Sequence, residues 1–196
     1  MIRAMFDTDV LADLDPTFPL LATYSDLVPN PGELRAKFPH SQIILIDRAL
    51  DDPSGQASVR DVETHADSIA GCADWYDRKL AAGVKYLTMY HDRADTAAIL
   101  ANLAGRKAFH WIATLDGTLH ITGFSPLRTP AAVQCLDAAH VGRHGDLSLV
   151  FEDAWHPAAA PAQLADALAK AIHARADVGH AAGLLAEVIG DLKIGA

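Results

Sequence analysis

The chain has little positive charge for its length. Its 196 residues include 16 lysines and arginines against 25 aspartates and glutamates, which gives a net charge of -9 at pH 7. Proteins that bind nucleic acids use basic side chains to displace counterions from phosphates, so this composition argues against a nucleic-acid partner. A sugar polymer is not excluded, because sugars are recognised through hydrogen bonds and ring stacking rather than through net charge.

Cysteine is scarce, and long apolar runs and targeting signals are missing. We expect Cys72 and Cys135, the two cysteines, to be buried thiols, although sequence alone does not decide whether they form a disulfide. No apolar run is long enough to span a membrane, and residues 1–7 lack the architecture of a signal peptide. We therefore expect synthesis in the cytoplasm, so that action outside the cell would require release or transport by another route.

Motifs for metals and cofactors are also absent. The ten histidines show no compact zinc spacing, and His140 and His144, four residues apart, lie in a glycine-containing loop rather than on a helix. Nothing resembles a glycine-rich phosphate loop. We expect neither a metal nor another cofactor.

Short apolar segments alternate with helical segments through the first half of the chain. We expect strands at residues 2–6, 20–24, 42–46, 57–63 and 84–90, and helices opening at Pro31, covering residues 66–82 and ending at Gly105. On the second helix, Ile69, Ala73, Tyr76 and Leu80 are expected to face inward. This alternation predicts parallel strands joined by right-handed crossovers.

The pattern changes in the second half. Residues 108–115 and 118–122 are separated by Asp116-Gly117, which predicts a hairpin, and further strands follow at 131–136 and 147–151. A parallel return needs about a dozen residues, so these strands cannot all be parallel to the first five. We predict an α/β fold, an irregular TIM-like (β/α) barrel with reduced helices and partly antiparallel closing strands. The barrel is assigned residues 1–156, and an alanine-rich helical tail, packed on it or docked to a partner, residues 157–196.

The strongest chemical signal is Asp61-Val62-Glu63 at the end of a predicted strand. Side chains alternate between the faces of a strand, so Asp61 and Glu63 point the same way, with Cα atoms about 6.5 Å apart. Two acids in one site raise each other's pKa, and one keeps its proton at neutral pH. A proton donor beside a carboxylate is suited to glycoside cleavage.

An ordered set of motifs resembles the lysozyme-like barrels of glycoside hydrolase family 25, in a short, divergent branch common in actinobacteria and their phages. The set comprises Phe6-Asp7-Thr8, Asp61-Val62-Glu63, Trp75-Tyr76, Ala81-Ala82-Gly83-Val84, Thr88-Met89-Tyr90, His110-Trp111-Ile112-Ala113 and Gly145-Asp146-Leu147-Ser148. The resemblance covers residues 1–155 and implies a final strand antiparallel to the others. Such a strand would bring Asp146 to the same rim as Asp7 and Glu63, where barrels of this type carry their active sites.

The resemblance implies a peptidoglycan muramidase that cleaves the β-1,4 bond after N-acetylmuramic acid. Glu63 would be the general acid, and Asp61 would stabilise the transition state or orient the substrate's acetamido group. Asp7 and Asp146 match the family's remaining acids, and Tyr90 and Trp111 could line a sugar-stacking wall. The protein would bind peptidoglycan or a related glycan, reach the cell wall by lysis or as part of a virion, and associate through its C-terminal helix with a virion partner or itself.

Two departures from the family pattern leave other functions open. The stretch Val133-Gln134-Cys135 stands where the family often has Trp-Gln-Tyr, and the spacing from Asp7 to Asp61 is short, which reduces the early loops. The alternative is a catalytically inactive barrel that serves as a cell-wall-binding or phage structural module. A third interpretation is hydrolysis of another polysaccharide.

Overall fold

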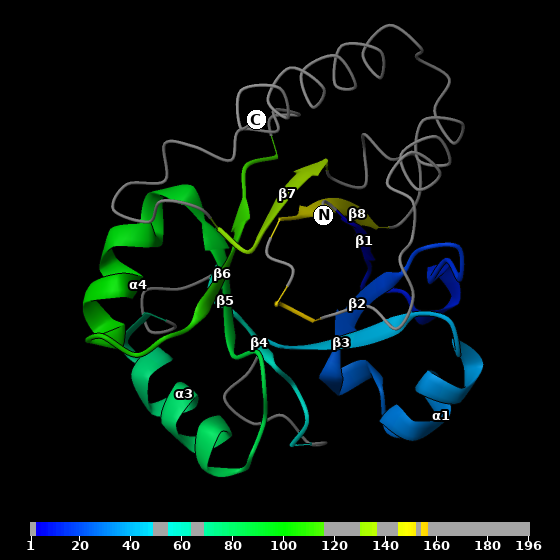
Figure 1. The fold of residues 1–196 in the computed structure, drawn as a ribbon, viewed down its shortest axis with the longest axis horizontal. Coiled ribbons are helices and arrows are strands. Elements are labelled where there is room, and N and C mark those ends of the chain that lie inside the picture. The colour runs from blue at the N-terminus through cyan, green and yellow to red at the C-terminus, as the bar shows by residue number, and fades with distance from the viewer. Residues whose placement is uncertain are drawn as a thin grey trace, which may run out of the picture.

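The computed structural model describes residues 3–48, 55–63, 69–115, 130–136, 145–151 and 154–156. Within these residues, eight strands close into one barrel in sequence order, with helices on its outside (Figure 1). The strands are β1 (Arg3–Asp7), β2 (Leu20–Tyr24), β3 (Gln42–Asp47), β4 (Val59–Asp61), β5 (Thr88–Asp92), β6 (Phe109–Ala113), β7 (Ala132–Leu136) and β8 (Asp146–Val150). The helices are α1 (Pro31–Lys37), α3 (Cys72–Ala81) and α4 (Thr96–Leu103), and single 3₁₀ turns lie at Leu11–Asp13, Ser25–Leu27 and Arg93–Asp95.

Strand direction confirms the mixed barrel that the sequence predicts. Strands β1 to β7 are parallel to one another, whereas β8 is antiparallel to both β7 and β1. Within the described residues, the strand that pairs with β6 on the side away from β5 is the parallel β7, and the hairpin expected after β6 stays a prediction. The connection from 114 to 131 is long enough for a parallel return. Residues 118–122 and the predicted tail at 157–196 lie outside the described residues.

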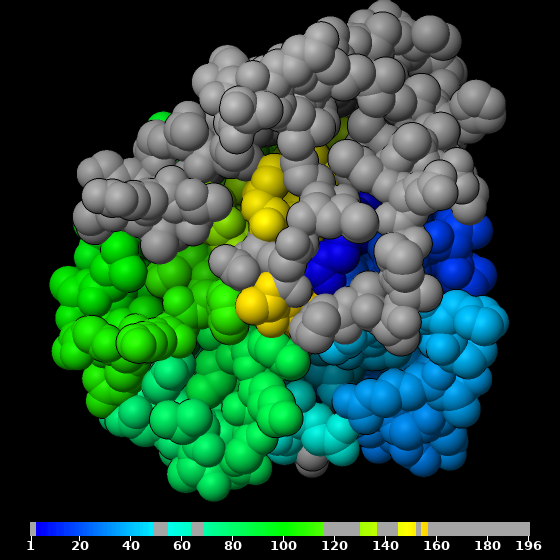
Figure 2. Space-filling view, viewed as in Figure 1, coloured from blue at the N-terminus to red at the C-terminus, as the bar shows by residue number. Residues whose placement is uncertain are grey.

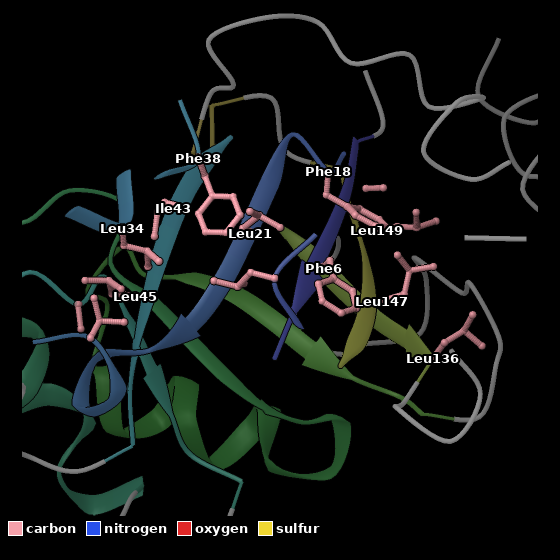
Figure 3. Close-up of a cluster of buried hydrophobic side chains, with 14 of the residues drawn as sticks. Phe6, Phe18, Leu21, Leu34, Phe38, Ile43, Leu45, Leu136, Leu147 and Leu149 are labelled. Carbon is pink, nitrogen blue, oxygen red and sulfur yellow. The ribbon is translucent and has the colours of Figure 1, made fainter. Parts of the chain in front are cut away.

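The strand sequences form two hydrophobic layers because their side chains alternate. In β3, Ile44 and Ile46 point into the barrel, while Ile43 and Leu45 pack outside with α1. Figure 3 shows this outer cluster, in which side chains of β1, β2, β3 and β8 meet those of α1. The interior is therefore a packed core rather than a channel.

Local signals explain where the helices begin and end. Asn30 caps α1 by accepting hydrogen bonds from the backbone N–H groups of Gly32 and Glu33, and Pro31 occupies the first helical position. Helix α3 ends before Gly83, which has a φ of +78°. No helix among the described residues combines the length and apolar character needed to cross a membrane.

The expected inward face of α3 is only partly correct. Tyr76 is buried, but Leu80 is 55% exposed, and the buried face is formed by Cys72, Trp75, Tyr76 and Lys79. The indole N–H of Trp75 donates to Asp47 Oδ2 at 2.9 Å, which draws this face of the helix towards the end of β3. Cys72 and Cys135 are both buried thiols and do not form a disulfide.

Residues 154–156 close the end of the barrel at which the parallel strands begin. Trp155 is fully buried, packs against Trp111 and donates its indole N–H to Thr88 Oγ1 at 2.7 Å. The guanidinium group of Arg3 donates to the carbonyl oxygens of Trp155 and His156. In Figure 2 the gold atoms of these residues lie at the centre of this face, beside the blue atoms of β1.

The Trp155→Ala substitution is expected to destabilise the fold by about 3–5 kcal/mol, because it removes a large side chain from the barrel interior and leaves a cavity. Leu80→Ala is the matched control, since a half-exposed leucine should change the free energy of unfolding by less than about 0.5 kcal/mol. Urea denaturation measures both values. A Trp155→Ala variant as stable as Leu80→Ala would contradict the closing role of Trp155.

Candidate active site at the carboxyl rim of the barrel

Four carboxyl groups meet at the rim where the parallel strands end. Asp7 ends β1, Asp146 begins the antiparallel β8, and the two residues are direct register partners. Asp61 ends β4, and Glu63 follows it two residues later. Asp146 and Glu63 both raise the pKa of Asp7 by charge repulsion, so the structure brings together the acids that the sequence predicts at one rim.

Asp61, the last residue of β4, and Glu63, just beyond the strand, flank Val62. Val62, between them, is buried in the outer cluster under α3, and its backbone N–H donates to the carbonyl of Tyr90 at 2.9 Å. The charge of Asp61 raises the pKa of Glu63, so the two acids lie close together at the end of β4.

Close packing of β1 against residue 145 sets the place of Asp146. A Cβ atom on Gly145 would lie 2.6 Å from the carbonyl oxygen of Asp7 and 2.3 Å from the ring of Phe6. Only glycine permits this approach. The Gly-Asp pair at the start of β8 thus allows Asp146 to sit directly beside Asp7.

Asp61 is held by two hydrogen-bond donors. Its Oδ1 accepts the backbone N–H of Glu63 at 3.0 Å, and its Oδ2 accepts the hydroxyl of Tyr24 at 3.2 Å. The pKa of Asp61 is raised overall, because burial outweighs these two hydrogen bonds and the nearby charges of Arg48 and Arg60, which lower it. These donors favour the ionised form of Asp61.

Glu63 is the better proton donor. Burial, the largest cause, together with the charges of Asp61, Asp92 and Asp146, raises the pKa of Glu63 from 4.5 to about 7, against a lowering interaction with the hydroxyl of Tyr90. Its Oε1 is buried and has no hydrogen-bond partner among the described residues. A carboxyl group with this pKa is partly protonated at neutral pH and can act as a general acid.

Asp7 is the most buried acid of the cluster. It is 8% exposed, and its Oδ1 has no hydrogen-bond partner within the described part of the chain. Burial first, and then the charges of Asp146 and Glu63, raise the pKa of Asp7 well above its ordinary value. Burial and the neighbouring acids therefore both disfavour the charged form of Asp7.

A chain of polar side chains connects Glu63 to Asp146 across the rim. The hydroxyl of Tyr90, which interacts with Glu63, donates to Gln134 Oε1, and Gln134 Nε2 donates to Asp146 Oδ2 at 2.6 Å. The hydrogen bond with the Tyr90 hydroxyl lowers the pKa of Glu63, so this contact opposes the larger raising effect of burial.

Two of the four acids, Asp7 and Asp146, border a cavity of about 250 Å³, whose lining does not include Asp61 or Glu63. Asp7, Tyr24, Arg48 and Asp146 line it, together with the backbone around Gly145. The guanidinium group of Arg48 lies 3.6 Å from the ring centroid of Tyr24 and pairs with Asp26 at 3.4 Å. The cavity therefore offers acidic groups on one side and a cation on the other, a suitable arrangement for hydroxyl-rich ligands.

The two predicted wall aromatics lie deeper than expected. Trp111 is fully buried in the barrel interior, stacks beside Tyr90 with ring centroids 4.6 Å apart, and donates its indole N–H to Ser148 Oγ at 3.0 Å. A ring without exposed surface cannot stack on a sugar, so Trp111 belongs to the floor below the site. Tyr90 is 5% exposed and reaches the rim only through its hydroxyl group.

Tyr24, Arg48 and Gln134 contribute to the site but were not predicted from the sequence. Tyr24 ends β2, and Arg48 directly follows β3, so the strand-end rule that selected the acids applies to them as well. Gln134 lies in the middle of β7, where no local signal marks it. No group of three or more His, Cys, Asp or Glu residues within the described ranges is arranged to hold a metal ion.

These features define the class of the molecule as a mixed eight-stranded barrel with a carboxyl cluster at its rim. No protein-family model matches the chain, and no curated protein matches it in sequence.

The raised pKa of Glu63 predicts a particular dependence of stability on pH. Between pH 4.5 and about 7 the folded state binds more protons than the unfolded state, so the contribution of Glu63 to stability is complete below pH 4.5 and is lost as the pH rises to about 7. The loss should be about 2 kcal/mol, allowing for solvent screening of a half-buried group.

Urea denaturation of wild type and Glu63→Gln at pH 4.5 and pH 7.5 measures this contribution. The stability of the wild type relative to the variant should fall over the interval. Leu80→Ala, which changes no titratable group, should run parallel to the wild type. Parallel curves for wild type and Glu63→Gln would show that the pKa of Glu63 is not raised.

Proposed function

We propose that the carboxyl rim is the active site of a glycoside hydrolase that acts on bacterial cell walls as a muramidase. The observation that carries this proposal is the pairing, at the end of β4, of Glu63, with a pKa of about 7, and Asp61, whose carboxyl group accepts hydrogen bonds from two donors. The order of motifs, which resembles glycoside hydrolase family 25, supports the same function.

In the proposed reaction Glu63 protonates the glycosidic oxygen as its bond to the sugar breaks. Positive charge then develops on the sugar ring, and the carboxylate of Asp61 stabilises it. Tyr24 donates to Oδ2 of Asp61 and so favours its ionised form, and Asp7 lies at the cavity as a further polar contact for the substrate. A water molecule then bonds to the sugar carbon and gives a proton to the Glu63 carboxylate, which completes hydrolysis and restores the acid.

A second function is a glycan-binding barrel without catalytic activity, acting at the cell wall or in a phage particle. The burial of Trp111 and of the Tyr90 ring favours it, because sugar-cleaving sites commonly stack their substrates on exposed aromatic rings. Co-sedimentation with purified cell walls, without release of new reducing ends, would support this function. Activity on another polysaccharide in a glycan panel would revise the proposed substrate but leave the proposed reaction, glycoside hydrolysis, unchanged.

The Glu63→Gln substitution should lower the rate of cell-wall clearing by at least about 100-fold, because glutamine keeps the shape of the side chain but cannot transfer a proton. Turbidity of purified walls and release of reducing ends measure the rate. Glu33→Gln, on the exposed side of α1, is the matched control and should clear walls like the wild type. Equal clearing by Glu63→Gln and Glu33→Gln would remove Glu63 from the mechanism.

Activity should fall as the pH rises through about 7, because Glu63 loses the proton that it must donate. Asp146→Asn should move this alkaline limb to lower pH, since it removes one of the negative charges that raise the pKa of Glu63 while keeping an oxygen that Gln134 can donate to. Asp74→Asn, on the exposed surface of α3, should leave the profile unchanged. An alkaline limb that does not shift in Asp146→Asn would show that the charge of Asp146 does not affect the pKa of Glu63.

A further inference from the structure

A second cavity, larger than the one beside Asp7, lies at the other end of the barrel, away from the acids. Its volume is about 550 Å³, within the usual range of small-molecule sites. Gln42 at the start of β3, Ser58 before β4 and Tyr86 before β5 line it, as does His156. The space-filling view looks onto this end, where a hollow separates the cyan atoms around α1 and β3 from the green atoms around α3 (Figure 2).

The charges at this cavity are opposite to those of the whole chain. Arg35 and Lys85 line it, and none of the described residues that line it is acidic, although the net charge of the protein is -9. Arg35 donates to Gln56 Oε1, an uncharged amide, at 2.8 Å. Lys85 has no carboxylate partner among the described residues. Two cations therefore face one hollow without neutralising acids from the described chain.

The inner wall is built from polar groups in fixed positions. His156 is 4% exposed, and its ring nitrogens lie 3.4 Å from Gln42 Nε2 and 3.3 Å from Ser58 Oγ. Burial, and then the charge of Arg3, lower the pKa of His156 to about 3, so its ring is neutral. Gln42 can donate to one ring nitrogen while the other donates to Ser58, which leaves the Ser58 hydroxyl proton for the cavity.

Backbone strain coincides with this wall. Tyr86 has a φ of +59° and His156 a φ of +42°, and their rings lie 4.8 Å apart. Residues with bulky side chains rarely adopt this left-handed conformation, and such strain tends to be retained at functional sites. The strained pair presents the Tyr86 ring to the cavity, beside the apolar side chains of Ile43 and Leu45.

We propose that this cavity is a second ligand site that binds a small phosphate monoester. The phosphate group lies between Arg35 and Lys85, and the ring of the ligand packs on Tyr86 while Ser58 and Gln42 bind its hydroxyl groups. A phosphate monoester carries a charge between about -1.5 and -2 at pH 7, which two cations balance. The guanidinium fork of Arg35 matches its oxygens.

An NMR titration of the full chain, following backbone amides, tests the site with glucose 6-phosphate, adenosine 5′-monophosphate, inorganic phosphate and uncharged glucose. Either ester should produce saturable shifts at Gln42, Ser58 and residues 83–86, and the tighter of the two identifies a sugar phosphate or a nucleotide as the source. The doubly substituted Arg35→Gln/Lys85→Gln protein should bind at least about 10-fold more weakly, since it loses both cations.

The matched control is Arg93→Gln/Lys107→Gln, which removes the same charge from exposed positions outside the cavity lining and should bind within about twofold of the wild type. Thermal melting of both double variants verifies that they fold. Absence of saturable shifts with both esters, equal binding of glucose, or unchanged affinity in Arg35→Gln/Lys85→Gln would each overturn the site. None of these outcomes depends on glycoside hydrolysis at the opposite rim.

Discussion

The antiparallel pairing of β8 with β1 determines what stands at both ends of this barrel. It aligns Asp7 with Asp146 and Arg3 with Val150, so the first residue of β8 lies at the rim where the parallel strands end. A parallel β8 would place Asp146 at the opposite end. Strand β8 ends at that opposite end, where Arg3 donates hydrogen bonds to the carbonyl oxygens of Trp155 and His156. One pairing therefore assembles the carboxyl cluster and closes the barrel beneath it.

Crowding acids at one rim has an electrostatic cost, and the fold limits it in two ways. Burial and neighbouring charges raise the pKa values of Asp7 and Glu63, that of Glu63 to about 7, while hydrogen bonds from Tyr24 and the Glu63 backbone favour the charged form of Asp61 against its burial. A purely structural rim would be more stable with apolar or neutral residues at these positions. The arrangement thus combines a stored proton with a fixed negative charge, which are the two requirements of acid-catalysed bond cleavage.

Much of this rim follows from local sequence rules, and the rest depends on packing between distant segments. Apolar strands that end in acids predicted Asp7, and a period of two predicted Asp61 and Glu63 on one face. Trp111 could not be placed in this way, because its burial depends on Ser148 across the barrel and on Trp155 below it. The role of Gln134 could not be predicted from the sequence either, since it follows only from the contacts of Gln134 with Tyr90 and Asp146. The α3 face was misjudged at Leu80 because the buried face runs through Cys72, Trp75, Tyr76 and Lys79, where Trp75 donates to Asp47.

Net charge is a weak guide to the ligands of such a molecule, because the two ends of the barrel differ in charge. The acids are concentrated where the parallel strands end, whereas Arg35 and Lys85 border the cavity at the other end. Electrostatic interactions in water fade beyond about 10 Å at moderate ionic strength, so a ligand responds to the charges within its own site. A chain with a net charge of -9 can therefore carry an anion site, provided that the barrel keeps its acids on the opposite rim.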